Sequence, residues 1–449
     1  MKLKTLMLEN FRGFEQFQCH FSSGINVLVG LNGYGKSSLL DAIAVAYGQF
    51  LSGFGTSTDR PIRESDIHLK KVLINDDHFS MELQFPVTVS ATIFEEETTS
   101  FPAHWARHRN TQKSTGTKNP ELSKLAKNLA NMVQSGAVPS LPLFAYYGTN
   151  RLWNQSFEPS NDMPDLAKNS RLEGYRDWNK PTTNYRSFSN WLYQETLANF
   201  EQEMKNQSFL TNTGMSKSNI YKDHLNALGK ALNTILQPSG WSNVHYSATA
   251  KQVVATHSIQ GDVPLSLLSD GVRNMIGMVA DIARRAIQLN PQMGNHAIID
   301  TQGIVLIDEV DMHLHPQWQR SILGSLEKAF PNIQFIVTTH SPLVISDVKG
   351  IHVNLLNNLN NAIQVPELYG QDANSVLLEI MDTDIRNAEV NEKLGDVLDA
   401  IHNSKNTKDI AKAKELLVVL DGDLPVINLE LSKAKLLLRK KELKIAQNN

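Results

Sequence analysis

The chain has 449 residues, more than one compact domain usually holds, so we expect a main domain with large insertions or an appended domain. Its composition, 41% hydrophobic and 20% charged, is ordinary for a globular protein, and its net charge of −3 gives no global attraction to nucleic acid or membranes. A single cysteine, Cys19, excludes an internal disulfide framework and any metal site built from several cysteines, which fits a reducing compartment.

No segment has the pattern of a targeting or membrane-spanning sequence. The start reads MKLKTLMLENFRGF, in which Glu9, Asn10 and Arg12 interrupt any apolar run of the kind a signal peptide needs. No apolar stretch elsewhere is long enough to cross a bilayer. We therefore expect a cytoplasmic protein with no membrane partner.

The first 97 residues predict the N-terminal lobe of an α/β domain. Alternating polar and apolar residues predict two strands, in MKLKTLMLENF and FEQFQCHFSSG, joined by a turn at Arg12 and Gly13. A buried strand, INVLVG, follows, and a helix is predicted in KSSLLDAIAVAYGQFL from its apolar spacing. A strand, a glycine-rich turn and a helix in this order are typical of the start of an α/β fold.

The middle of the chain departs from this pattern twice. Residues 98–140 are polar and irregular, which predicts a surface insertion, mobile in part. Residues 141–152 return to an apolar strand and a loop, LPLFAYYGTNRLW. Residues 153–244 predict a second insertion that is mostly helical.

Residues 245–370 predict the C-terminal lobe of the same domain, and residues 371–449 a helical C-terminal region suited to oligomerisation, to partner docking or simply to packing on the domain. The lobe starts with a strand in QVVATHSIQG and continues with a helix from about Asp270. Its remaining predicted elements are a strand at 304–308, a helix at 317–329 and a strand at 333–338.

The sequence GLNGYGKSS, which joins the buried strand to its helix, fits the phosphate-binding pattern G-x-x-x-x-G-K-[ST]. Its glycines allow main-chain N–H groups to surround phosphate oxygens, and the helix start adds a favourable dipole. Lys36 is predicted to reach the β- and γ-phosphates, and the Ser37 hydroxyl to ligand Mg²⁺. The predicted ATP-binding residues of the loop are Gly30, Asn32, Gly33, Gly35, Lys36, Ser37 and Ser38.

A second motif, GIVLIDEVDMHLHP, ends a buried strand in two carboxylates. Beside a phosphate loop, Asp308 would hold Mg²⁺ through a water, and Glu309 would orient and deprotonate the attacking water. The alternative is a metal cluster for cutting phosphodiesters, in which Asp311, His313 and His315 would join the two acids. The histidines are two residues apart and precede a proline, which favours turn residues over zinc ligands.

The order of four motifs indicates the type of ATPase. After the phosphate loop come LSDGVRN, the acid pair and FIVTTHSP, and this order resembles the ABC-type ATPase head of the RecF, SMC and Rad50 superfamily. The resemblance implies that Ser269 and Gly271 close over the γ-phosphate held by an opposite subunit, and that His340 senses that phosphate. Taken alone, Ser269 would be only the N-cap of a helix.

The resemblance is incomplete. NFRGF matches the segment that would bring Arg12 near the nucleotide, although a surface turn is the plainer interpretation of this arginine. No glutamine occupies an obvious Q-loop, so Asn150 or Arg151 is expected to fill that place. No heptad-patterned arm of Rad50 length is present. The predicted fold is an ABC-type P-loop ATPase head with a mixed β-sheet, two insertions and a helical C-terminal region.

Together with the helical tail that starts at YGQDANSVLLEIM, these motifs most resemble the PtuA family of Septu-type and retron-linked anti-phage systems. The resemblance implies a homo-oligomer, at least a dimer, that binds ATP and Mg²⁺ and works with a separate HNH nuclease of the PtuB kind. DNA could be reached through that complex; RKKELK in the tail is a possible contact, although a solvated helix face is the simpler interpretation.

Other functions remain open. One is a RecF- or SMC-like ATPase in DNA repair, and another is a nucleotide-gated scaffold with little turnover. A third is an OLD-type nuclease, in which Asp421 and Asp423 of LLVVLDGD would end a TOPRIM metal strand. The residues before this run favour a helix instead.

Overall fold

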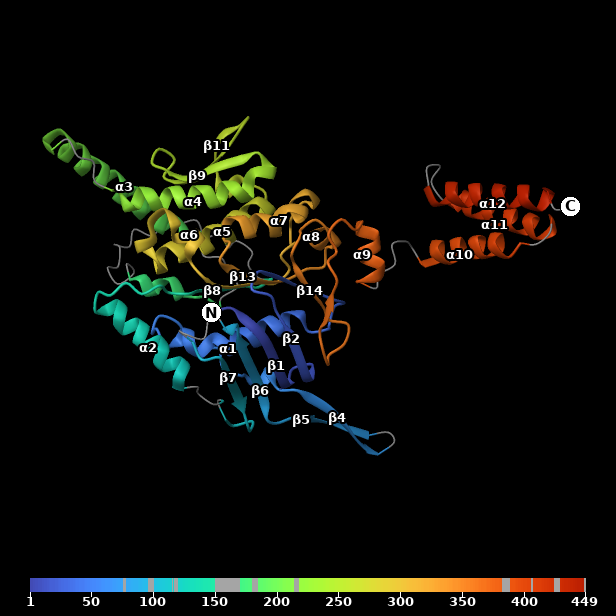
Figure 1. The fold of residues 1–449 in the computed structure, drawn as a ribbon, viewed down its shortest axis with the longest axis horizontal. Helices are drawn as coiled ribbons and strands as arrows, with labels where there is room; N and C mark the ends of the chain where they lie inside the picture. Colours follow the sequence, from blue (N-terminus) through green and yellow to red (C-terminus); the bar gives the residue numbers. More distant parts are fainter. Residues whose placement is uncertain are drawn as a thin grey trace. The chain divides into compact units, whose positions relative to one another are not determined.

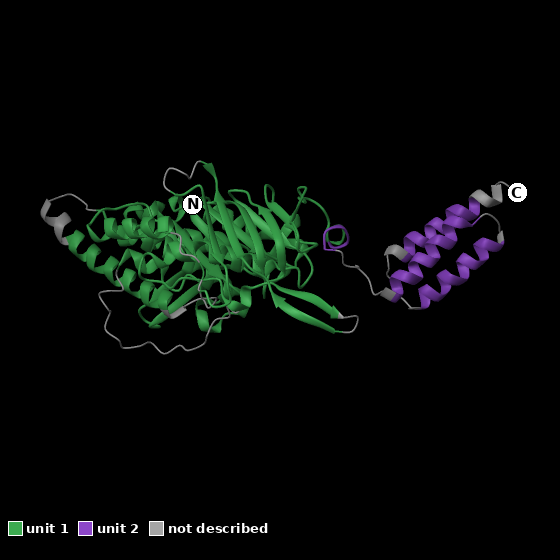
Figure 2. Ribbon diagram, turned by 90° about the horizontal axis from the view of Figure 1, so that it is seen from below, with its two compact units in different colours: residues 1–376 green, residues 377–449 purple. Residues whose placement is uncertain are grey.

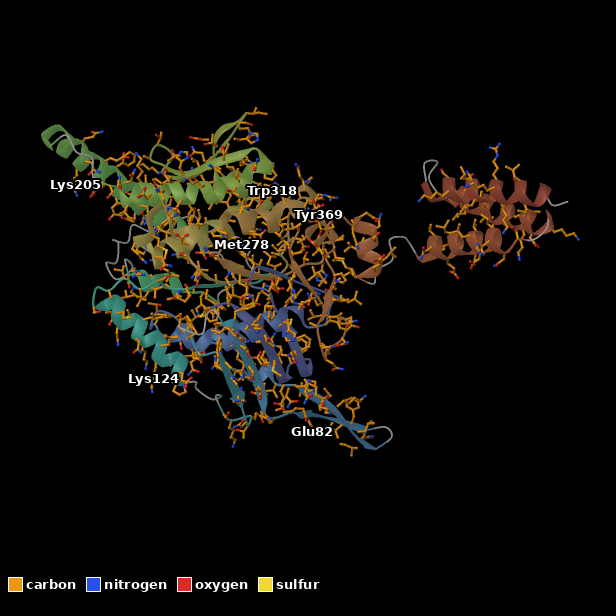
Figure 3. All side chains as sticks on the ribbon, viewed as in Figure 1. Glu82, Lys124, Lys205, Met278, Trp318 and Tyr369 are labelled. Atoms are coloured by element: carbon orange, nitrogen blue, oxygen red, sulfur yellow. The ribbon has the colours of Figure 1, made fainter. Side chains whose placement is uncertain are left out.

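The computed structural model describes residues 1–75, 78–95, 101–114, 116, 120–149, 170–179, 185–213, 218–381, 388–404, 407–423 and 429–447. The chain forms two compact units, residues 1–376 and residues 377–449 (Figure 2). Charged side chains such as Lys124 and Lys205 lie at the periphery of the first unit, and Met278 lies in its interior (Figure 3). Among the described helices, none combines the length and apolar character needed to cross a membrane.

A six-stranded sheet forms the centre of the first unit. Its spatial order is β15-β14-β3-β13-β12-β8, with only β15 antiparallel to its neighbour. The strands are β3 (Ile25–Val29), β8 (Leu143–Tyr147), β12 (Gly303–Ile307), β13 (Ile333–Thr338), β14 (His352–Leu355) and β15 (Ile363–Val365). Every residue of β3, β12 and β13 is buried, as expected of parallel strands covered on both faces. The predicted α/β class with a mixed sheet is confirmed.

Helices cover both faces of this sheet. The helix α1 (Lys36–Ser52) is buried almost all round because it lies between the six-stranded sheet and a second sheet (Figure 1). On the opposite face lie α5 (Asp270–Leu289) and α7 (Pro316–Ala329) (Figure 1). Short helices complete this layer: η7 (Pro291–His296), α6 (Ala297–Asp300) and α8 (Pro342–Ser346).

The second sheet is antiparallel, in the order β2-β1-β6-β7. Its strands are β1 (Leu3–Phe11), β2 (Phe14–His20), β6 (Val87–Ile93) and β7 (His104–Arg109). The predicted pairing of the first two strands across Arg12 and Gly13 is confirmed. A separate hairpin of β4 (Leu69–Asn75) and β5 (His78–Leu83) follows the short helix η1 (Glu64–Asp66).

The expectation of an irregular insertion over residues 98–140 was wrong in two places. β7 completes the antiparallel sheet by pairing with β6, and α2 (Pro120–Gln134) packs against α1. β7 escaped prediction because its sequence, HWARHR, is charged, yet Trp105, Arg107 and Arg109 are buried. The terminal nitrogens of Arg107 donate hydrogen bonds to the Asp59 carboxylate and to two main-chain carbonyls, and these contacts offset the cost of burying the cation.

The second insertion is mostly helical where it is described. It contains η4 (Arg171–Tyr175), α3 (Tyr185–Thr213), α4 (Ile220–Leu236) and η5 (Gln237–Ser239). A three-stranded antiparallel sheet follows, made of β9 (Trp241–Ser247), β10 (Gln252–His257) and β11 (Gly261–Pro264), and η6 (Leu265–Leu267) leads into α5. The predicted strand in QVVATHSIQG is β10.

The second unit is helical, as predicted for the end of the chain. The boundary between the units falls within α9 (Ala373–Glu379), and the unit contains α10 (Ala388–Asn403), α11 (Thr407–Asp423) and α12 (Leu429–Gln447). These three helices share an apolar core that includes Val397, Ala413 and Ala434. LLVVLDGD lies inside α11, so the alternative of a TOPRIM strand ending at Asp421 and Asp423 was wrong.

Candidate active site

The phosphate loop joins β3 to α1, and its last glycine is the N-cap of that helix. Gly35 has φ +85°, and a Cβ on it would come within 2.4 Å of the Phe14 ring. A side chain here would therefore be strained by its backbone conformation and would also clash with β2. Glycine at this position lets the loop turn into the first exposed N–H groups of α1, which is the arrangement that binds phosphate.

Lys36, the first residue of α1, is buried beneath this loop. Its Nζ donates hydrogen bonds to the carbonyls of Gly30 at 2.7 Å and Leu31 at 3.0 Å. Burial lowers the pKa of Lys36, while the carboxylates of Asp308 and Glu309 act in the opposite direction. The two carboxylates therefore do not fully offset the cost of burying the ammonium group. A bound anion such as phosphate would stabilise the positive charge further.

A cavity of about 220 Å³ opens where β3, β12 and β13 end. The carboxyl ends of parallel strands are the usual binding edge of such sheets. The residues that line the cavity are Asn32, Gly33, Gly35, Lys36, Ser37, Ser38, Asp308, Glu309, Thr338 and His340. The fold thus brings most of the predicted loop residues together with the acid pair and the histidine.

Asp308 and Glu309 are held by the neighbouring strand. The hydroxyl of Thr338 donates a hydrogen bond of 2.6 Å to Asp308 Oδ1, and it accepts one of 2.7 Å from the main-chain N–H of Glu309. Asp308 is buried, and its negative charge raises the pKa of Lys36 against the effect of burial. His340, two residues beyond Thr338, is exposed at the cavity.

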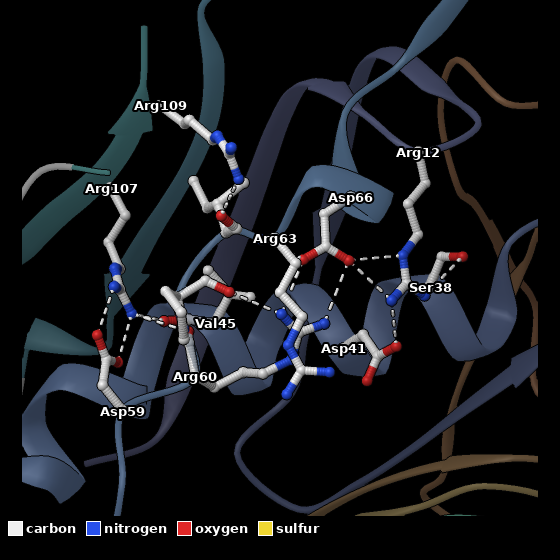
Figure 4. Close-up of polar contacts among 12 residues, drawn as sticks. Arg12, Ser38, Asp41, Val45, Asp59, Arg60, Arg63, Asp66, Arg107 and Arg109 are labelled. Carbon is white, nitrogen blue, oxygen red and sulfur yellow. Dashed lines mark hydrogen bonds and ion pairs between the residues drawn. The ribbon is translucent and has the colours of Figure 1, made fainter. Parts of the chain in front are cut away.

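Arg12 contacts the cavity-lining residue Ser38 but does not line the cavity. Its guanidinium forms ion pairs with Asp41 at 2.7 Å and Asp66 at 2.8 Å, and it reaches the Ser38 hydroxyl at 3.4 Å (Figure 4). Burial would lower the pKa of Arg12, but Asp41 and Asp66 together raise it above its ordinary value. Arg12 is therefore a fixed positive charge behind Ser38 and does not itself line the cavity.

The signature segment lies outside this cavity within the same chain. Ser269 is the N-cap of α5, but its side chain makes no capping hydrogen bond and is exposed. Gly271 packs instead against the main-chain carbonyl of His313, in the turn that follows the acid pair. Neither Ser269 nor Gly271 lines the cavity, and Gly30 does not line it either, although its carbonyl accepts a hydrogen bond from Lys36.

The alternative of a metal cluster around the acid pair receives no support. Within the described residues, no group of three or more His, Cys, Asp or Glu side chains is arranged to hold a metal ion. His315 is the N-cap of α7 and accepts a hydrogen bond from the Gln317 N–H, and Asp311 accepts one from Thr339. The two Q-loop candidates, Asn150 and Arg151, lie outside the described residues.

Three residues of the site were missed from the sequence. Thr338 lines the cavity, Asp41 pairs with Arg12, and Tyr146 lies close to Asp41 and Asp308, whose carboxylates add to burial in raising its pKa well above the usual range. A signal existed for Asp41, because it follows Ser37 by four residues and therefore shares its face of α1. The partners of Thr338 and Tyr146 are distant in sequence.

Comparison with known proteins identifies the family. A family model described as an AAA domain matches residues 5–237, about half of the chain. The chain belongs to the AAA domain family. A second AAA-domain model, whose description names an AbiEii toxin of a type IV toxin–antitoxin system, matches residues 167–346 of this AAA-domain protein.

Individual relatives agree with this assignment. The AAA-domain chain is 29% identical to "Retron Ec83 probable ATPase" of Escherichia coli, over 80% of this chain and 72% of the relative. It is 23% identical to "Septu protein PtuA" of Bacillus thuringiensis, over 76% of this chain and 72% of the relative. The predicted similarity to PtuA and the retron ATPases is confirmed.

A solved SMC head, bound to the C-winged helix domain of ScpA, aligns with 81% of this chain and 98% of its own at 14% identity and a TM-score of 0.46. This overlap is too loose to bear on the chemistry of the AAA-domain chain.

Proposed function

We propose that this protein is an ATP-hydrolysing switch subunit that works as a head-to-tail dimer, or a higher oligomer, with ATP bound between two copies. One observation carries the proposal: the cavity is lined by Lys36, Ser37, Asp308, Glu309 and His340, whereas Ser269 is exposed outside it. A helix start with an exposed serine and no capping bond is suited to contact a phosphate on another molecule. Each site would thus need Ser269 and Gly271 from a second copy.

The side chains present fit a nucleotide triphosphate and Mg²⁺. The loop offers main-chain N–H groups and a lysine for the phosphates, and the Ser37 hydroxyl and Asp308 carboxylate are oxygen ligands of the kind that Mg²⁺ prefers. Bound there, Mg²⁺ would neutralise charge on the phosphate oxygens. Ser37 and Asp308 are the residues that would hold it.

The reaction would be hydrolysis of ATP to ADP and phosphate. Glu309 would accept a proton from water as the water oxygen forms a bond to the γ-phosphorus, and the bond to the β–γ bridging oxygen would break. Lys36 and His340 would stabilise charge on the γ-phosphate. Loss of that phosphate would remove the group shared by the two copies, so hydrolysis would open the dimer.

The biological role proposed is anti-phage defence. The similarity to Septu PtuA and to the retron Ec83 ATPase supports this role, and through the PtuA resemblance it supports regulation of a separate HNH nuclease of the PtuB kind. DNA would be reached through that complex. The helical unit of residues 377–449, which has its own core, is our candidate for oligomerisation or nuclease docking. A gene for a short HNH protein beside this one would support the partnership.

Mixing two inactive variants tests the shared site. Ser269→Arg would block the signature surface, and Lys36→Ala would disable the phosphate loop. Each variant alone should lose ATP turnover, while an equal mixture should regain about a quarter of the wild-type rate, because half of randomly paired dimers carry one intact site of two.

The matched control is Ser258→Arg, which places the same substitution on another exposed serine, in the turn between β10 and β11. It should keep wild-type turnover. If the mixture stays inactive while wild-type monomers hydrolyse ATP unaided, the shared site is wrong.

A further inference from the structure

Thr338 is placed where the two halves of the cavity meet. It is the last residue of β13, and β13 lies between β3, which leads into the phosphate loop, and β12, which ends in the acid pair. The residue is fully buried, yet it lines the cavity. A hydroxyl at this point can bond the Asp308 carboxylate and the main chain of Glu309.

The single hydroxyl of Thr338 serves both acids at once. It donates to Asp308 Oδ1 at 2.6 Å, which fixes the rotation of that carboxylate, and it accepts from the Glu309 N–H at 2.7 Å. Because a hydroxyl has one proton to give and lone pairs to receive, the two bonds use complementary capacities of the same oxygen.

The bond to the Glu309 N–H has a conformational consequence. Glu309 has φ +50°, a left-handed backbone conformation that a residue with a side chain adopts only when its surroundings impose it. The hydrogen bond from its N–H to Thr338 is one such constraint, and Val310, the next residue, donates its N–H to the Thr338 carbonyl at 2.9 Å. Thr338 thus forms hydrogen bonds with three consecutive residues of the turn, Asp308, Glu309 and Val310.

Thr339, the residue after Thr338, also donates a side-chain hydrogen bond to an acid of this turn and accepts one from a main-chain N–H. Thr339 donates a hydrogen bond of 2.6 Å to Asp311 Oδ1 and accepts one of 3.0 Å from the Ser341 N–H. The segment that leads to His340 is therefore tied at two successive residues to the turn that carries the acid pair.

We propose that Thr338 is a positioning residue for ATP hydrolysis: it orients Asp308 toward the magnesium position and holds Glu309 in the conformation that directs its carboxylate at the attacking water. This inference rests on the proposed function. Removal of the hydroxyl would take away an acceptor of the Glu309 N–H and a donor to Asp308, and small displacements of reacting groups lower rates steeply.

The test compares Thr338→Val, which keeps the shape and removes the hydroxyl, with Thr338→Ser, which keeps the hydroxyl. Thr338→Val should lower kcat by roughly 10²-fold and raise the Mg²⁺ concentration for half-maximal turnover, with ATP affinity measured without Mg²⁺ changed by no more than about threefold. Thr338→Ser should recover most of the kcat and the wild-type Mg²⁺ dependence.

Thr301→Val is the matched control, because Thr301 is equally buried and hydrogen-bonded but lies just before β12, at the end opposite the acid pair. It should lower the melting temperature without changing kcat or the Mg²⁺ dependence. Three results would overturn the proposal: an unchanged kcat in Thr338→Val, equal losses in the valine and serine variants, or a parallel loss of thermal stability and Mg²⁺-free ATP binding.

If the wild-type protein has no ATPase activity, the proposed function is wrong. The positioning of Asp308 by Thr338 can still be tested. Binding of a fluorescent ATP analogue would then be measured with and without Mg²⁺. Mg²⁺ should tighten binding to the wild type and to Thr338→Ser but not to Thr338→Val. If Mg²⁺ tightens binding equally in all three proteins, Thr338 does not position Asp308.

Discussion

The main-chain carbonyl of His313 lies directly against Gly271, and a Cβ on that glycine would stand 2.4 Å from the carbonyl oxygen. Gly271 is the second residue of α5 and lies two residues after the exposed Ser269, and His313 belongs to the turn that follows Asp308 and Glu309. The surface proposed to meet another copy's ATP is therefore in contact with the turn that carries the acid pair of its own chain. A displacement of the start of α5 must therefore displace the turn that contains His313, and the reverse.

Gly271→Ala tests this contact. Real Cβ atoms do not approach a main-chain oxygen this closely, so α5 or the 309–315 turn must move. We expect ATP turnover to fall by about tenfold or more, since displacements of this size at reacting groups are costly, while single chains still bind nucleotide. Gly395→Ala in α10 is the control, because a Cβ there meets nothing within 4 Å. Unchanged turnover in Gly271→Ala would contradict the coupling.

Asp281→Ala should destabilise the first unit strongly. Asp281 on α5 is buried and accepts hydrogen bonds from Arg284, from Arg285 and from the Tyr147 hydroxyl, at 2.6, 2.7 and 2.9 Å. Burial would raise the pKa of Asp281, but Arg285 and Arg284 hold it well below its usual range. Without the carboxylate, two buried guanidinium groups lose their counter-charge.

Removal of one partner from a buried ion pair costs about 3–5 kcal/mol, and we expect a loss of this size in the free energy of unfolding of Asp281→Ala from denaturant titration. Asp300→Ala, at a carboxylate that is 53% exposed, should change that free energy by less than about 1 kcal/mol. Equal losses in the two variants would mean that the charge cluster contributes nothing specific.

The sequence predicted well those parts of the fold whose pattern depends only on neighbouring residues in the chain. The central strands β3, β12 and β13 are mostly apolar because parallel strands are buried on both faces, and Asn26, Gln334 and Thr338 are their only polar residues. The phosphate loop and the acid pair were found because their chemistry is confined to a few adjacent residues. Their assembly into one cavity follows from the common edge at which parallel strands end.

What escaped prediction depends on partners distant in sequence. Two of the buried residues of β7 are arginines. The sequence does not show that Asp59 and a main-chain carbonyl accept hydrogen bonds from Arg107. Thr338 looks like any β-branched strand residue until β13 is placed beside β12. The exposed side chain of Ser269 could not be told from an ordinary helix cap, because the missing hydrogen bond is visible only in three dimensions.

His224 should make the stability of the first unit depend on pH. It is buried on α4, with Nδ1 at 3.2 Å from Glu195 Oε2 and Nε2 at 3.1 Å from the Pro291 carbonyl oxygen. Burial lowers the pKa of His224, but the hydrogen bond and charge of Glu195 outweigh it, so the net shift is upward.

A pKa raised on folding gives stability that is fully present below the unfolded pKa of about 6.5 and is lost as pH rises through the folded value. The free energy of unfolding should therefore fall as the pH rises above about 6.5 in the wild type and be flatter in His224→Gln. His296→Gln, at a histidine whose side chain is 73% exposed, should keep the wild-type slope. A slope that survives in His224→Gln would assign the pH dependence to another group.

The nucleotide site should survive removal of the second unit. All residues that line the cavity lie between Asn32 and His340, whereas α10, α11 and α12 share an apolar core of their own. A chain ending after Met381, which keeps α9 whole, should therefore bind ATP within about twofold of the full-length affinity, since distant, independent regions contribute additively.

The mass of the truncated protein in solution then distinguishes two uses of the helices. If they oligomerise the protein, the truncated form should be smaller than expected from the lost residues alone, both with and without ATP. If they serve only to dock a partner, ATP should still assemble the truncated heads into dimers, as light scattering after gel filtration would measure. Loss of ATP binding on truncation would contradict the independence of the two units.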